Sequence, residues 1–134
     1  MRHLLTLAAL FALCLTGAYA AGVSSLSLSA AAKTRKLLKK KVECSYKDTR
    51  LEDVVEDLKS QIDGLKMQLD TKGGVSRNQA ITYKAKGVTL EEALDAMFKK
   101  NGLGYIVISG KKNAYDGSIQ IRQGKERGRP LKDK

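Results

Sequence analysis

The side chains that most often carry out catalysis or hold metal ions are scarce in this chain. It has one histidine, His3, and two cysteines, Cys14 and Cys44. General acid–base and nucleophilic catalysis rely on histidine, on activated cysteine or serine, or on paired carboxylates, and metal sites need a closely spaced set of ligands. No such set is present, and Gly73-Gly74 lacks the Lys-Ser/Thr that completes a phosphate-binding loop. We therefore expect no catalytic, cofactor-binding or metal-binding residues, and we do not expect an enzyme.

The carboxylates fall into two groups with the spacing of a helix surface. Acidic side chains early in a helix interact favourably with the positive end of its dipole and can satisfy its free amides. We therefore interpret both groups as helix caps and solvent-facing charges. They are Glu52, Asp53, Glu56 and Asp57, and Glu91, Glu92 and Asp95.

The N-terminal residues have the pattern of a secretory signal peptide. A basic segment containing Arg2 precedes an apolar run over residues 4–16, and residues 18–20 (AYA) provide the small-x-small sequence that signal peptidase recognises. The apolar run is shorter than the roughly 20 residues that a membrane-spanning helix needs. We predict a signal peptide over residues 1–20 and an exported protein, periplasmic or secreted, with no transmembrane segment after cleavage. Its only cysteine would be Cys44.

The formal net charge is +11 at pH 7, and cations are concentrated at both ends of the mature chain. Blocks of like charge are usually solvated and disordered, and they often serve as interaction tails. We expect a disordered basic leader over residues 21–41 and a disordered basic tail over residues 123–134. Their cations suggest an alternative function, the binding of a polyanion such as anionic envelope lipid, an acidic glycan or nucleic acid. These candidates are Lys33, Arg35, Lys36, Lys39, Lys40, Lys41, Lys125, Arg127 and Arg129.

An internal repeat organises the region between the two basic segments. Residues 42–70 and 79–109 each have the pattern of a strand, a short turn, an amphipathic helix, a glycine stop and a second strand. Alternation in the first strand places Cys44 on its buried face. Residues 118–122 (SIQIR) alternate again and predict an extra strand. We therefore predict one α+β domain over residues 42–122, a duplicated βαβ unit plus a final strand (βαββαββ).

The predicted helices have start and stop signals. Thr49 with Glu52, and Thr89 with Glu92, have the spacing of a capping box, in which each side chain bonds to the backbone amide of the other residue. Gly102 follows the second helix and suits the left-handed conformation that ends many helices.

Three short stretches of the repeat carry a family resemblance. Residues 46–55 (YKDTRLEDVV), 88–95 (VTLEEALD) and 101–108 (NGLGYIVI) are similar to the opening, the second half and the GLxY strand start of the secretin and TonB N-terminal short domain. Arg50 stands where that family commonly has proline. The resemblance covers residues 42–122.

This resemblance implies both a fold and a kind of function. The fold would be two helices packed between a two-stranded and a three-stranded sheet. The function would be that of a non-catalytic contact module, because in secretins and TonB-dependent receptors the domain docks to inner-membrane components or signals to them. The chain would then be a stand-alone exported domain that binds envelope proteins, such as secretion or TonB-linked machinery. No specific nucleic-acid partner is expected.

The strand over residues 118–122 is the candidate contact site, because it is short, alternating and outside the repeat. At an exposed sheet edge a partner strand gains main-chain hydrogen bonds, and alternate side chains give specificity. The same edge could pair with a second copy and form a homo-oligomer. Residues 105–108, by contrast, are apolar on both sides, which predicts a central strand. The candidate edge residues are Ser118, Ile119, Gln120, Ile121 and Arg122.

Overall fold

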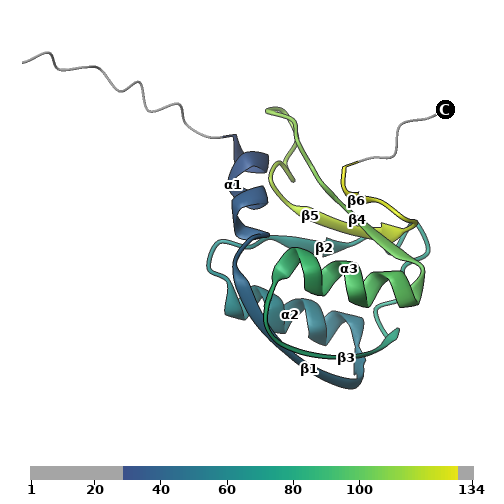
Figure 1. Ribbon diagram of the computed structural model, residues 1–134. Coiled ribbons are helices and arrows are strands. Elements are labelled where there is room, and N and C mark those ends of the chain that lie inside the picture. The colour runs from purple at the N-terminus through teal and green to yellow at the C-terminus, as the bar shows by residue number, and fades with distance from the viewer. Residues whose placement is uncertain (1–28, 130–134) are drawn as a thin grey trace, which may run out of the picture.

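The computed structural model describes residues 29–129, so the predicted signal peptide lies outside the described residues. Within this range the predicted α+β class is confirmed, with three helices and two sheets (Figure 1). In chain order the elements are α1 (Ala30–Leu37), β1 (Lys41–Arg50), α2 (Leu51–Gln61), β2 (Met67–Leu69), β3 (Ala80–Thr89), α3 (Leu90–Asn101), β4 (Leu103–Val107), β5 (Ile119–Gln123) and β6 (Arg127–Gly128).

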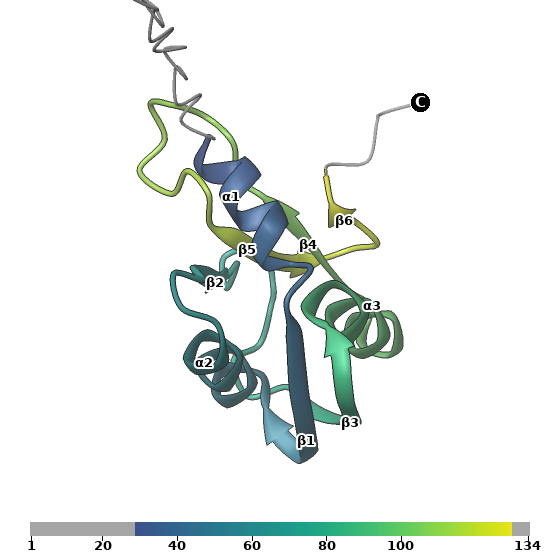
Figure 2. The ribbon, with the colours of Figure 1, turned by 60° about the vertical axis from the view of Figure 1, so that its left-hand side comes forward.

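The elements form three layers, in which α2 and α3 lie between the two sheets (Figures 1 and 2). One sheet consists of β1 and β3 in antiparallel pairing, and the other has the strand order β2-β5-β4-β6. Apolar residues at helical spacing give each helix a buried side, and the inward positions of the strands complete the core. The buried helix residues are Leu51, Val54, Val55 and Leu58 in α2, and Leu90, Ala93, Leu94, Met97 and Phe98 in α3.

The predicted boundaries of α3 are confirmed. The Glu92 amide donates to the Thr89 hydroxyl at 3.2 Å, and the Thr89 amide donates to the Glu92 carboxylate at 3.1 Å, which completes a capping box. Gly102 ends the helix in the left-handed conformation, with φ of 66°. Other residues are disfavoured in this conformation because their Cβ atom clashes with the backbone, whereas glycine has no Cβ atom.

The capping box predicted for α2 is wrong. The Thr49 hydroxyl donates to the Lys47 carbonyl instead of accepting from the helix. Arg50 is the N-cap residue and makes no capping bond with its side chain. The first amides of α2 donate to backbone carbonyls of the segment before β3. The Leu51 amide, for example, donates to the Gln79 carbonyl at 2.8 Å. Tertiary contacts therefore replace the local cap.

The middle strands of the four-stranded sheet are β5 and β4. The central position predicted for residues 105–108 is confirmed, since β4 pairs with β5 on one side and with β6 on the other. The edge position predicted for residues 118–122 is wrong, because Gln120 of β5 lies opposite Gln68 of β2 and Ile106 of β4. The alternating pattern correctly indicated one buried face, but it carries no information about whether the strand's backbone is paired on one side or on both.

The disordered leader predicted over residues 21–41 is wrong from residue 29 onward, where α1 and the start of β1 lie, and residues 21–28 lie outside the described residues. Ala31, Thr34 and Leu38 are buried, and the Thr34 hydroxyl donates to the Gly117 carbonyl in the loop between β4 and β5. The Leu38 carbonyl accepts from the Glu91 amide of α3 at 2.9 Å. An isolated helix of this length is marginal, but burying one leucine contributes about 1.5–3 kcal/mol. Docking therefore stabilises a segment whose charge suggested disorder.

The disordered tail predicted over residues 123–134 is also wrong as far as residue 129. Strand β6 adds to β4, so the second sheet has four strands where three were predicted. The Arg127 side chain fixes this strand, since its Nε donates to Asp95 at 2.6 Å and its Nη1 donates to the Leu103 carbonyl at 3.0 Å. Residues 130–134 lie outside the described residues.

None of the helices within residues 29–129 has the length and the apolar character that crossing a membrane requires.

Candidate functional site

The only cysteine of the described residues lies in the core. Cys44 is 1% exposed, as its alternation predicted, and burial raises the pKa of its thiol. Nearby, the Tyr46 hydroxyl donates a hydrogen bond to Asp57 at 2.6 Å. Burial is the larger cause, and this hydrogen bond the second, that raises the pKa of Tyr46. A buried thiol with a raised pKa is a poor nucleophile. This cluster therefore joins β1 to α2 and offers no accessible chemistry.

Within residues 29–129, no group of three or more His, Cys, Asp or Glu side chains is placed to hold a metal ion.

The predicted contact strand offers side chains to solvent but not a free backbone edge. Ser118, Ile119 and Ile121 are buried, whereas Gln120 and Arg122 are partly exposed on the opposite face of β5. Arg122 lies 3.7 Å from Glu126, measured between Nε and Oε1. Strand addition along β5 is therefore excluded, because β2 and β4 already occupy both of its edges.

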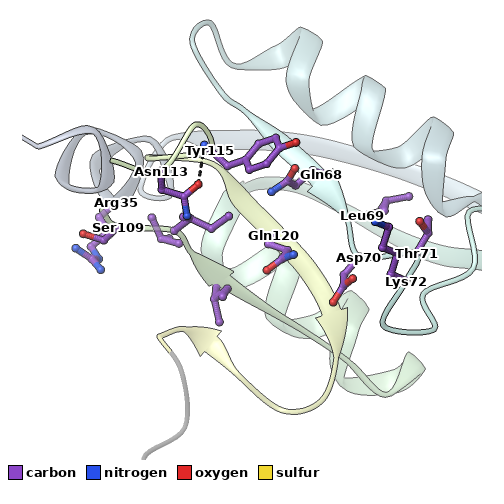
Figure 3. Close-up of a pocket in the computed structure, with 13 residues that line it drawn as sticks. Arg35, Gln68, Leu69, Asp70, Thr71, Lys72, Ser109, Asn113, Tyr115 and Gln120 are labelled. Atoms are coloured by element: carbon purple, nitrogen blue, oxygen red, sulfur yellow. Dashed lines mark hydrogen bonds between the residues drawn. The ribbon is translucent and has the colours of Figure 1, made fainter. Parts of the chain in front are cut away.

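A hollow of about 670 Å³ lies over the outer face of the four-stranded sheet (Figure 3). We call it the outer hollow. The strand register places Gln68, Gln120 and Ile106 in one row across β2, β5 and β4, facing away from the helices. Its lining comprises Arg35, Gln68, Leu69, Asp70, Thr71, Lys72, Ile106, Val107, Ile108, Ser109, Asn113, Tyr115 and Gln120.

Side-chain hydrogen bonds hold both loops that border the outer hollow. In the loop between β4 and β5, the Tyr115 amide donates to the Asn113 side chain at 2.9 Å (Figure 3), and the Gly110 amide donates to Asp116 at 3.1 Å. In the loop after β2, the Gly73 amide donates to Asp70 at 2.9 Å. These bonds shape the rim in the unbound chain.

Tyr115 is the one large hydrophobic residue of the described range that is exposed, at 58%. Tyrosine is enriched in protein interfaces, because its ring supplies apolar area and its hydroxyl a hydrogen bond. Tyr115 was not predicted as a contact residue, since a lone tyrosine within a polar turn has no periodic signal. The outer hollow thus has an aromatic group at its rim and a mixed amide and apolar floor.

The outer face of the two-stranded sheet differs in kind. Its side chains include Glu43, Ser45, Lys84 and Lys86, all exposed, and they have the character of an ordinary solvated face. The outer hollow, with its exposed aromatic ring and partly apolar lining, is therefore the better candidate for a binding surface.

The two basic segments of the sequence meet in space. Arg35 and Lys39, from α1 and the turn that follows it, line the same hollow of about 270 Å³ as Arg127 and Arg129 of β6 and its end. We call it the α1–β6 hollow. These cations were predicted to bind a polyanion, but their convergence has no sequence signal, because the two segments are about 90 positions apart in the chain. The other predicted polyanion-binding cations do not line it, and they are Lys33, Lys36, Lys40, Lys41 and Lys125.

No protein-family model, curated protein or solved structure matches the chain.

Proposed function

We propose that the chain is an exported, non-catalytic interaction module that binds an acidic segment of an envelope protein in the outer hollow. The observation that carries the proposal is the outer face of the four-stranded sheet, where, among the described residues, the exposed Tyr115 lines the same hollow as the partly exposed side chains of Gln68, Ile106 and Gln120. Aromatic side chains beside partly apolar, partly polar surface are typical of energetic centres of protein interfaces.

The chemistry of the lining indicates the kind of segment that would bind. Each glutamine side chain can donate and accept hydrogen bonds, so the pair suits the amides and carbonyls of an extended peptide. Two cations, Arg35 and Lys72, line the hollow together with one acid, Asp70. This balance favours an acidic segment, and attraction between opposite charges would mainly increase the association rate.

The family resemblance belongs to the same proposal. The element order β1, α2, β2, β3, α3, β4, β5 and the packing of α2 and α3 between two sheets support the proposal of a βαββαββ domain like the secretin and TonB N-terminal short domain. Helix α1 and strand β6 would be additions to that plan. As a contact module of the envelope, such a domain would reach its partner after export through the signal peptide predicted over residues 1–20.

Site-specific photo-cross-linking tests this proposal. A photoreactive amino acid replaces Tyr115 in the full chain, and a matched control carries it at Lys84 on the outer face of the two-stranded sheet. We expect position 115 to cross-link one envelope protein under conditions in which position 84 does not. Equal cross-linking from both positions would contradict the proposal, and cross-links between two copies would identify the hollow as a homo-oligomer interface instead.

A further inference from the structure

The α1–β6 hollow has a concentration of unpaired positive charge that the proposed protein contact does not require. Four cations line it with one exposed acid, Glu91, and among the described residues only one of the four, Arg127, is paired, with Asp95 outside the lining. Arg35, Lys39 and Arg129 take part in none of the ion pairs found among residues 29–129. Cations gathered without acidic partners repel one another, and a bound anion would relieve that repulsion.

Arg127 is held in place by the fold and keeps a donor free. Its Nε donates to Asp95 at 2.6 Å, and its Nη1 donates to the carbonyls of Leu103 and Glu126 at 3.0 and 2.9 Å. No hydrogen bond among the described residues uses Nη2. The side chain is 29% exposed, so a ligand would meet an arginine that is already oriented and partly shielded from water. Such preorganisation lowers the entropic cost of binding.

The nearby start of α3 does not supply the anion site. The amides of Leu90 and Glu91 donate to the carbonyls of Lys40 and Leu38, each at 2.9 Å. The segment after α1 therefore occupies these helix donors, and the positive character of the hollow comes from side chains on two separate segments.

We propose that the α1–β6 hollow binds a phosphomonoester group, a compact oxyanion with a charge of about −1.5 to −2 at pH 7. Arginine guanidinium groups match phosphate oxygens in a forked geometry, and lysine adds a further charge. Convergence of four cations on one small hollow suits a single doubly charged group. A nucleic-acid strand carries single charges spaced along its length and would require an extended track of cations. Inorganic phosphate, a soluble phosphomonoester and a lipid headgroup that ends in phosphate share the proposed chemistry.

The test uses two matched double variants of the full mature chain. One, Lys39→Gln with Arg129→Gln, removes two cations of the hollow. The control, Lys33→Gln with Lys125→Gln, removes one exposed cation from each of the same basic segments but outside the hollow. All four side chains are exposed, and circular dichroism checks that both variants fold. Arg35 is left unchanged because it also lines the outer hollow, so a failure here is distinct from a failure of the proposed protein contact.

Isothermal titration calorimetry at about 0.1 M salt measures the affinity and the stoichiometry of binding for inorganic phosphate and for glycerol 3-phosphate. We expect one ligand per chain, at least tenfold weaker binding in the hollow variant, and less than threefold weaker binding in the control. Lowering the pH from 7.5 to 5.5 should weaken binding of the phosphomonoester, because its second pKa lies near 6. Sulfate, which stays doubly charged, controls for titration of the protein itself.

Two further probes identify the source of the phosphate group. Vesicles that contain phosphatidic acid are compared with phosphatidylserine vesicles of equal charge, and stronger binding to the first would indicate a lipid headgroup. Equal losses in the two double variants would overturn the proposal, because they would indicate diffuse surface charge. Binding of a single-stranded oligonucleotide without binding of either phosphate would overturn it in favour of a linear polyanion.

Discussion

Replacing Leu38 by alanine tests whether α1 is a packed part of the domain. Leu38 is 5% exposed and lies in the turn between α1 and β1, where its carbonyl accepts from the Glu91 amide of α3, and the neighbouring Leu37 is only half-buried. Leucine-to-alanine changes in cores cost about 2–5 kcal/mol through lost burial and the cavity left behind. Leu38 is at the periphery of the core, where its neighbours can relax, so we expect a loss of about 2–3 kcal/mol.

Urea unfolding of the mature chain, followed by circular dichroism, measures this loss. For a domain of this size, 1 kcal/mol corresponds to about 4–8 °C in melting temperature, so Leu38→Ala should lower it by about 10–20 °C. Leu37→Ala, the matched control, should lower the free energy of unfolding by less than about 1 kcal/mol, because the side chain is partly solvated already. Equal, small losses in both variants would refute the packing of α1 and remove Arg35 from the wall of both hollows.

Three further outcomes follow from the described geometry. Thr89→Ala should lower the free energy of unfolding by about 1 kcal/mol by breaking the capping box, whereas Thr49→Ala should lower it by less than about 0.5 kcal/mol; equal losses in urea unfolding would contradict the difference in caps. Cys44 should react with a thiol reagent at pH 8 only when the chain unfolds, since it is buried and its thiol pKa is raised; fast reaction of the native chain would disprove this. Burial raises the pKa of Tyr105 to about 12, so its contribution to stability should be complete below pH 10 and lost as the pH rises through 12; a Tyr105→Phe variant with an unchanged decline above pH 10 would argue against it.

Local sequence patterns predicted the features that depend on local chemistry. The capping box at Thr89, the left-handed stop at Gly102 and the burial of Cys44 each follow from residues a few positions apart, and the structure has all three. The apolar run of residues 105–108 predicted a central strand, because a strand with two apolar faces must be covered on both.

The features that the sequence did not reveal depend on contacts between distant segments. Alternation in residues 118–122 describes side chains, whereas the edge or central position of a strand depends on backbone partners from β2 and β4. The charge of α1 suggested disorder, but alanine at position 31 and leucine at position 38 allow it to dock. Arg35 and Arg127 line the same hollow because α1 docks on the domain and β6 joins the sheet. Neither of these two arrangements has a local signal in the sequence.

The outer hollow is tested as the contact site most directly by the affinity of the cross-linked envelope protein for the Tyr115→Ala variant of the full chain. Tyr115 is exposed in the unbound structure, so its loss should leave folding unchanged while removing the aromatic contact. If the outer hollow is the contact site, Kd should rise about 30-fold, the effect of losing an interface residue worth about 2 kcal/mol, and Lys84→Ala should leave it unchanged. An unchanged Kd for Tyr115→Ala, or an equal loss for Lys84→Ala, would contradict the account.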